Sequence, residues 1–149
     1  MAGTEVQAPP VEAGHMEFNW PVRVYYEDTD SAGVVYHSNY LKYMERARTE
    51  WLRALGFSQQ HLREAEGVLF VVMDMTIRFL RPARFDEQLN VTSRLNNMNA
   101  ASMNFTQSIY NDDADPICTA EVAIACLDAA SMKPRRIPEA IKETCRHGG

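Results

Sequence analysis

Three carboxylates stand close together in the N-terminal third of the chain, at Glu27, Asp28 and Asp30. Gly33 follows them, and His37 lies where a long amphipathic stretch begins. The start of a helix presents unpaired backbone N–H groups and the positive end of the helix dipole, and such donors can stabilise a developing oxyanion. A carboxylate beside a helix start therefore predicts a site for acyl transfer.

Two other interpretations of these residues stay open. Asp28 and Asp30 could be turn residues and His37 a solvated cap, which is a common role for these residue types. The carboxylates could instead bind a metal ion, but Ca²⁺ takes about 6–8 oxygen ligands from a longer loop and Zn²⁺ needs more His or Cys nearby. GxSxG, P-loop and GxGxxG motifs are missing. The sequence therefore lacks the characteristic motifs of serine hydrolases, nucleoside triphosphatases and dinucleotide-binding enzymes. We expect neither a metal nor a cofactor.

Composition narrows the class of partner. The 149 residues include 20 acidic and 15 basic side chains, a formal net charge of −5, so no broad positive surface is available for nucleic acid. Apolar residues make up 46% of the chain, as in a globular protein, and no apolar run approaches the roughly 18 residues of a membrane span.

The cysteines and the N-terminus indicate a compartment. Cys118, Cys126 and Cys145 are odd in number and lack CxxC spacing, which suits a reducing environment. The first 22 residues contain no Lys or Arg, so we do not expect them to form a secretory signal. We expect a cytoplasmic protein whose residues 1–16 are a disordered tail and whose residues 17–149 form a single domain.

Periodicity indicates the elements that must position the carboxylates. Residues 18–26 alternate as a half-buried strand, and apolar positions from 40 to 55 recur at helical spacing, with Ser38 or Asn39 as N-cap and Gly56 closing the helix. A short helix over 58–66 ends at Gly67. Four further strands follow, separated by short turns that favour antiparallel pairing, at 68–80, 88–96, 102–110 and 117–127.

This outline predicts an α+β fold. The apolar face of the long helix needs a large partner, and only one face of a five-stranded antiparallel sheet offers it. The other face of the sheet is expected to stay partly apolar, which favours association through that face or through an edge. Arg48 falls on the apolar stripe of the helix, so it should lie at the edge of the stripe or meet a carboxylate.

The segment over residues 22–55, VRVYYEDTDSAGVVYHSNYLKYMERARTEWLRAL, resembles the 4-hydroxybenzoyl-CoA thioesterase family of hotdog-fold enzymes. Its DTDxxGVVYHxxY portion is the specific part, and the similarity is greatest to the branch associated with the Tol–Pal system of Gram-negative bacteria. The resemblance continues through FVVMDMTIRFLRPARFD at 70–86, FTQ at 105–107 and MKPR at 132–135.

The resemblance implies a hotdog fold, a sheet wrapped around one long helix, and acyl-CoA thioester hydrolysis in a homodimer or homotetramer with the site at a subunit interface. It maps the catalytic carboxylate to Asp30, as nucleophile or general base, with Tyr26 and His37 as accompanying site residues. The backbone N–H groups near His37 would polarise the thioester carbonyl. On composition alone Asp28 is an equal rival to Asp30.

One departure from the family concerns CoA. Relatives carry basic residues at the turn between the third and fourth strands, whereas residues 96–101 here are uncharged. Lys133, Arg135 and Arg136 are then the candidates for the CoA phosphates, although a basic terminal segment can also be merely solvated. The uncharged turn leaves open acyl carrier protein as the acyl donor, or a non-catalytic acyl-binding or carrier-binding module linked to envelope or phospholipid metabolism. A hotdog hydratase or dehydratase is a third possibility, which the DTDxxGVVYH run disfavours.

Overall fold

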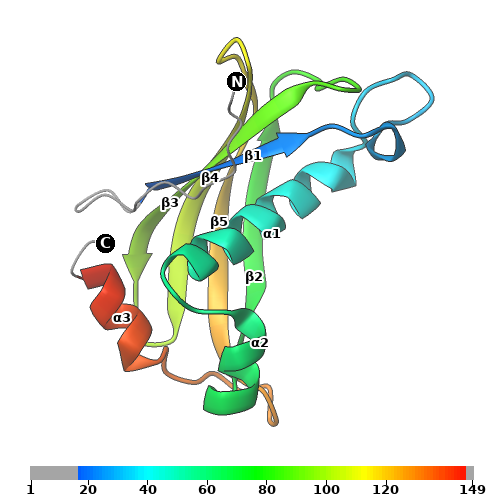
Figure 1. The fold of residues 1–149 in the computed structure, drawn as a ribbon. Coiled ribbons are helices and arrows are strands. Elements are labelled where there is room, and N and C mark those ends of the chain that lie inside the picture. The colour runs from blue at the N-terminus through cyan, green and yellow to red at the C-terminus, as the bar shows by residue number, and fades with distance from the viewer. Residues whose placement is uncertain (1–16, 147–149) are drawn as a thin grey trace.

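The computed structural model describes residues 17–146, so the tail expected at residues 1–16 and the last three residues of the expected domain lie outside it. These described residues form five strands, one long helix and several short helical segments (Figure 1). In order these are β1 (Glu17–Arg23), η1 (Tyr26–Asp28), α1 (His37–Ala54), α2 (Gln59–His61), η2 (Leu62–Glu66), β2 (Val68–Phe79), β3 (Gln88–Met98), β4 (Ser102–Asn111), β5 (Pro116–Asp128) and α3 (Glu139–Arg146).

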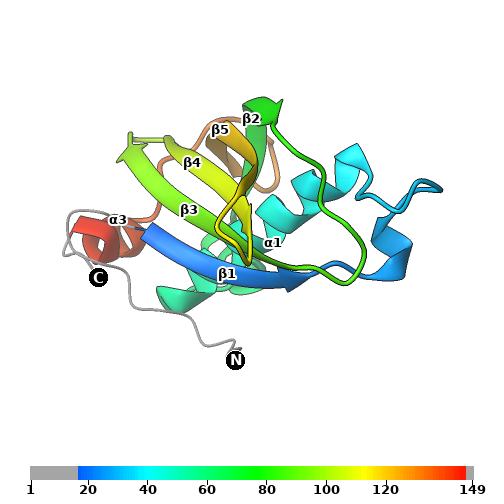
Figure 2. The same cartoon turned by 90° about the horizontal axis from the view of Figure 1, so that it is seen from above.

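The strands form one antiparallel sheet in the order β1-β3-β4-β5-β2. The sheet curves around α1, which lies along its concave face (Figure 2). β2 is an edge strand because its one partner among the described strands is β5. The predicted α+β hotdog architecture is therefore confirmed.

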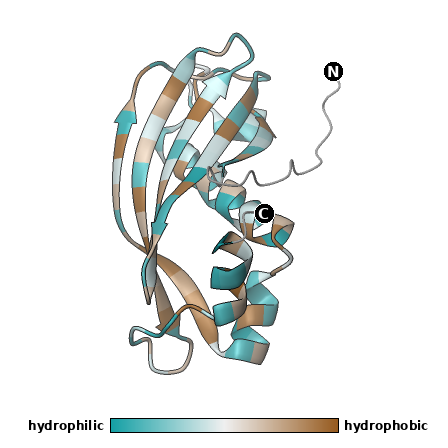
Figure 3. Cartoon of the chain, turned by 90° about the vertical axis from the view of Figure 1, so that its left-hand side faces the viewer, coloured by the Kyte–Doolittle hydropathy of each residue, from teal (hydrophilic) through white to brown (hydrophobic). Residues whose placement is uncertain are grey.

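Alternation along the strands separates the two faces of the sheet (Figure 3). In β4, Met103, Phe105 and Ile109 are buried against α1, whereas Thr106 and Ser108 face outward. Polar side chains also pair across the outer face, where the Thr106 hydroxyl donates to Glu121 at 3.0 Å. The exposed apolar side chains of the sheet lie on the edge strand instead, at Val72, Met73 and Phe79. The exposed apolar side chains of the sheet therefore lie at its edge and not on its outer face.

The long helix begins earlier than its sequence suggested. Its first residue is His37 and its N-cap is Tyr36, so the expectation that Ser38 or Asn39 caps it is wrong. The physical reason is that the Asn39 side chain is needed elsewhere: its amide donates to the Asp28 carbonyl at 2.9 Å and to the Asp28 carboxylate at 3.2 Å. Gly56 closes the helix as expected, with φ of 98°.

Helices α2, η2 and α3 lie at the same end of the sheet, where β2 begins and β5 ends (Figure 1). The side chain of Ser58 caps α2 by accepting from His61 N at 3.0 Å, and Gly67 ends η2 with φ of 70°. The C-terminal α3 did not show in the strand-and-turn outline, yet it buries Ile141 completely. The basic terminal segment is therefore partly packed structure and not only a solvated tail.

Candidate active site

The segment between β1 and α1 is braced against the connection between β2 and β3. The backbone N–H of Val35 donates to the Ala83 carbonyl at 2.8 Å, and Val34 forms an isolated antiparallel bridge with Arg84. The Tyr40 hydroxyl accepts from the Ala83 N–H at 3.1 Å. The carboxylate segment is thus held between a helix and a loop that lie far apart in the sequence.

The two aspartates of the segment differ in the hydrogen bonds that their carboxylates accept. Both carboxylate oxygens of Asp28 accept hydrogen bonds, from Tyr25 N at 2.9 Å and from the Asn39 amide at 3.2 Å. Asp30 accepts only through Oδ1, from Ala32 N at 2.8 Å and from Val34 N at 3.4 Å. Within the described residues, Oδ2 of Asp30 has no partner, so this oxygen is the one that can reach a substrate or a water molecule.

Asp30 and His37 line the same hollow, of about 290 Å³. Tyr40 and Phe79 form part of its wall, and the His37 ring meets Phe79 edge-to-face with centroids 5.0 Å apart. No side chain caps the first turn of α1, and the Asn39 N–H donates to the Tyr36 carbonyl at 2.9 Å. The N–H groups of His37 and Ser38 have no partner among the described residues and remain open to a ligand. The predicted neighbourhood of one carboxylate and one helix start is therefore present in the fold.

Tyr26 is not part of this hollow. Its side chain is 79% exposed and packs edge-to-face on Phe85 at 5.8 Å, along a separate shallow depression beside Arg23 and Asp86. Within one chain the structure therefore brings together Asp30 and His37 but not Tyr26. Tyr40, which the sequence placed only in the core, is buried there and also lines the hollow that holds Asp30.

The three basic candidates lie at the opposite end of β2. The Arg135 guanidinium donates to the Gly67 carbonyl at 3.1 Å and to the Asp128 carboxylate at 3.0 Å, just before β2 begins. Phe79 and the Asp30 hollow are at the other end of this 12-residue strand, roughly 35 Å away. Lys133 and Arg136 are exposed, and no side-chain partner for either is present among residues 17–146.

Arg135 is occupied by the pair that it forms. Hydrogen bonds from the backbone N–H of Ser131 and of Ala130, together with Arg135, hold the pKa of Asp128 below its usual range. Of the three candidate phosphate contacts, Lys133 and Arg136 are therefore freer to meet an anion than Arg135.

A buried polar group that sequence reasoning missed is Gln107, whose side chain is 0% exposed. Its carbonyl oxygen accepts from Arg48 at 2.9 Å, and its amide donates to the Met44 carbonyl at 3.1 Å and to the Ser93 hydroxyl at 2.8 Å. Arg48 is half-buried, as expected for the edge of the apolar stripe, and it meets an amide; the alternative expectation, a carboxylate partner, is not found among the described residues. An available signal was the polar residue at an inward position of an alternating strand.

Two further findings concern metal binding and membrane crossing. Within residues 17–146, no three His, Cys, Asp or Glu side chains are arranged to hold a metal ion, and Glu27, Asp28 and Asp30 do not converge. None of the described helices combines the length and the apolar character that crossing a membrane requires.

Comparison with known proteins adds one family match, two curated relatives and one solved structure. Residues 24–145 match the thioesterase-like superfamily. The chain is 50% identical over 124 residues to the acyl-CoA thioester hydrolase YbgC of Escherichia coli, covering 83% of this chain and 92% of that one, and 42% identical over 130 residues to the acyl-CoA thioesterase YbgC of Haemophilus influenzae, covering 87% and 95%. A probable thioesterase from Bartonella henselae superposes with a TM-score of 0.76 at 40% identity, covering 80% of this chain and 98% of the other.

Proposed function

This chain belongs to the thioesterase-like superfamily, and from that membership we propose that it is an acyl-CoA thioesterase with Asp30 as its catalytic carboxylate. The observation that carries the assignment of Asp30 is its partner-free Oδ2 in the hollow that also holds the first turn of α1. Asp28, whose two oxygens both accept hydrogen bonds inside the loop, serves to fix the segment.

The chemistry follows from this arrangement. A substrate carbonyl oxygen near His37 would accept hydrogen bonds from the open N–H groups of the first turn, which stabilises the negative charge that develops there. Asp30 either attacks the carbonyl carbon, giving a mixed anhydride that water opens, or removes a proton from the attacking water. In both routes the thiolate leaves without strong acid assistance, so positioning and oxyanion stabilisation are the main demands on the protein.

The test is release of free thiol from a panel of acyl-CoAs by matched variants. Asp30→Asn should keep the fold, because Oδ1 of the amide can still accept from Ala32, and should lower kcat at least ~10²-fold. Glu27→Gln removes a carboxylate three residues away and should stay near wild-type activity. Near wild-type turnover by Asp30→Asn would refute the assignment.

We also propose that the working unit contains two copies joined through β2. Within one chain the strand separates the basic residues from Asp30, but an antiparallel pair of β2 edges related by a two-fold axis reverses one copy. The basic end of the second copy then lies beside Asp30 of the first, where Lys133 and Arg136 can meet the CoA phosphates. An unpaired edge with exposed Val72, Met73 and Phe79 supports this pairing.

The pairing can be tested at the middle of the strand. Met73 is 60% exposed and sits at the bulge between Val72 and Asp74. Met73→Arg should convert the wild-type oligomer to smaller species in sedimentation experiments and reduce turnover, whereas Asn19→Arg, at an exposed position of the opposite edge strand β1, should do neither. A wild-type monomer, or an oligomer unaffected by Met73→Arg, would contradict this arrangement.

A second candidate function is a binding module for acyl chains or acyl carrier protein. The uncharged turn between β3 and β4 supports it: Asn99 closes that turn by donating to the Ser102 carbonyl at 2.7 Å, with no cation to hold CoA there. Saturable binding of acyl carrier protein without thiol release from any substrate would favour this function over hydrolysis. The cytoplasmic location and the link to the Tol–Pal system remain predictions, which cell fractionation and co-purification would test.

A further inference from the structure

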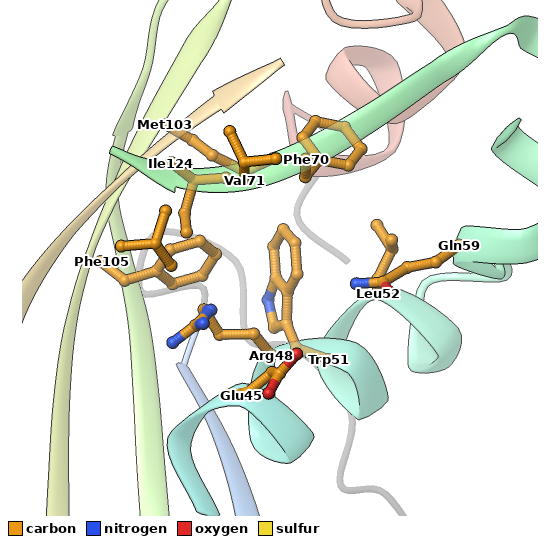
Figure 4. Close-up of a pocket in the computed structure, with 11 residues that line it drawn as sticks. Glu45, Arg48, Trp51, Leu52, Gln59, Phe70, Val71, Met103, Phe105 and Ile124 are labelled. Carbon is orange, nitrogen blue, oxygen red and sulfur yellow. The ribbon is translucent and has the colours of Figure 1, made fainter. Parts of the chain in front are cut away.

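A second hollow, the α1–β2 pocket, opens between the C-terminal half of α1 and the sheet (Figure 4). Its volume is about 280 Å³. Most of its wall is apolar and comes from α1, β2, β4 and β5, namely Leu52, Phe70, Val71, Met103, Phe105 and Ile124. A cavity with such walls suits the apolar body of a small molecule.

Two polar groups of this pocket donate hydrogen bonds and have unused capacity. Arg48 makes one hydrogen bond, to Gln107, and forms no ion pair with any described residue. Trp51 is only 2% exposed, and its indole N–H is buried without a hydrogen-bond partner. In Figure 4 the indole nitrogen and the guanidinium both lie on the side of the pocket occupied by Phe105.

The protein leaves the indole N–H of Trp51 without an acceptor and gives the Arg48 guanidinium one neutral acceptor but no ion-pair partner among the described residues. Trp51 meets the Phe105 ring edge-to-face at 5.0 Å, and an aromatic face is a weak acceptor for an N–H group. Burial lowers the pKa of Arg48, and the carboxylate of Glu45 partly offsets this, but a guanidinium stays protonated in proteins. The Glu45 side chain is exposed on the pocket's wall and forms no ion pair with Arg48. A ligand that supplies an anionic oxygen would satisfy both donors.

The pocket follows the same seam as the hollow that holds Asp30. Both lie between α1 and β2, one beside Tyr40 and Phe79 and the other beside Arg48 and Val72. Eight residues of helix separate Tyr40 from Arg48, which is roughly 12 Å along the axis. This axial distance matches the length of a medium-length acyl chain that starts at the Asp30 hollow and ends in the α1–β2 pocket.

We propose that the α1–β2 pocket selects acyl groups that end in a carboxylate, with Arg48 and Trp51 donating hydrogen bonds to that terminal group. The inference rests on the proposed thioesterase function and adds to it the class of acyl group. The apolar walls hold the methylene chain, and the two unmatched donors hold its anionic end.

The test compares substrates of equal length that differ only at the far end: adipoyl-, suberoyl- and sebacoyl-CoA against hexanoyl-, octanoyl- and decanoyl-CoA. At one or more lengths the wild type should prefer the carboxylate-ended substrate in kcat/KM. Arg48→Met should lower that preference about 10- to 100-fold, and Trp51→Phe, which removes only the N–H donor, about threefold to tenfold. Arg53→Met, an exposed site on the same helix, should leave the preference unchanged.

A binding measurement separates this proposal from the proposed function. Free suberate should bind to wild type and to Asp30→Asn alike in calorimetric titration, and binding should weaken in Arg48→Met by a similar factor. If no thioester is hydrolysed but suberate binds in this way, the thioesterase assignment fails and the carboxylate pocket stands. If methyl-ended substrates are preferred at every length, or if Arg48→Met and Trp51→Phe leave the preference unchanged, the carboxylate pocket is overturned.

Discussion

Gln107 offers a test of how the core is held together. Its side chain joins α1, β3 and β4 through three hydrogen bonds, one of them from the charged Arg48. A bond to a charged group contributes about 1.5–3 kcal/mol and a neutral one about 0.5–1.5 kcal/mol. Gln107→Leu keeps the approximate volume but leaves Arg48 and the Met44 carbonyl without this partner. We expect it to lower the free energy of unfolding by about 3–5 kcal/mol.

The coupling between Gln107 and Arg48 is the sharper part of that prediction. Arg48→Met alone should lower the free energy of unfolding by about 1.5–2 kcal/mol, because the buried Gln107 oxygen loses its donor. The double variant should lower it by about 1.5 kcal/mol less than the sum of the two single variants. Urea unfolding followed by tryptophan fluorescence measures all four free energies. The exposed Glu50–Arg53 pair, at 3.1 Å, is the control and should couple by less than about 0.5 kcal/mol. Additive single effects at Gln107 and Arg48 would refute the reasoning.

Two further predictions concern the loop and the cysteines. Gly33 has φ of 82°, and its N–H donates to the Asp30 carbonyl at 3.0 Å. Gly33→Ala should therefore lower the free energy of unfolding by about 1–2 kcal/mol and slow thioester hydrolysis several-fold. Gly56→Ala, at a φ of 98° away from the site, should lower the free energy of unfolding by a similar amount without slowing turnover. Burial raises the pKa of Cys118 to about 12 and of Cys145 to about 11, and it also raises that of Cys126. At pH 8 these thiols are therefore protonated, and Ellman's reagent should label them slowly in the native protein but label all three in guanidinium. Rapid labelling of the native protein would contradict this.

Much of the fold could be read from local patterns. The alternation of Met103, Phe105 and Ile109 and the helical spacing of Met44, Ala47 and Trp51 follow directly from which side chains are buried on one face. The boundaries were less secure: the helix begins at His37 because the Asn39 amide binds Asp28, a contact that spacing alone does not reveal. α3 was missed because its apolar pattern is only two turns long.

The candidate site likewise has some features that the sequence determined and others that only the tertiary structure decided. The sequence by itself determined that carboxylates precede a helix start, and its motif indicated Asp30. The tertiary structure adds a physical difference between Asp30 and Asp28, in the hydrogen bonds that each accepts. It also moved Tyr26 out of the hollow and brought in Tyr40.

The strand order and register of the sheet decide which residues far apart in the sequence lie close together. β2 puts Lys133 and Arg136 far from Asp30 within one chain, and the register of β4 points Gln107 at Arg48, 59 residues earlier. Local periodicity records which face of an element is buried but not which distant side chain meets it. That meeting depends on strand order, register and twist, which are set by the packing of the whole core.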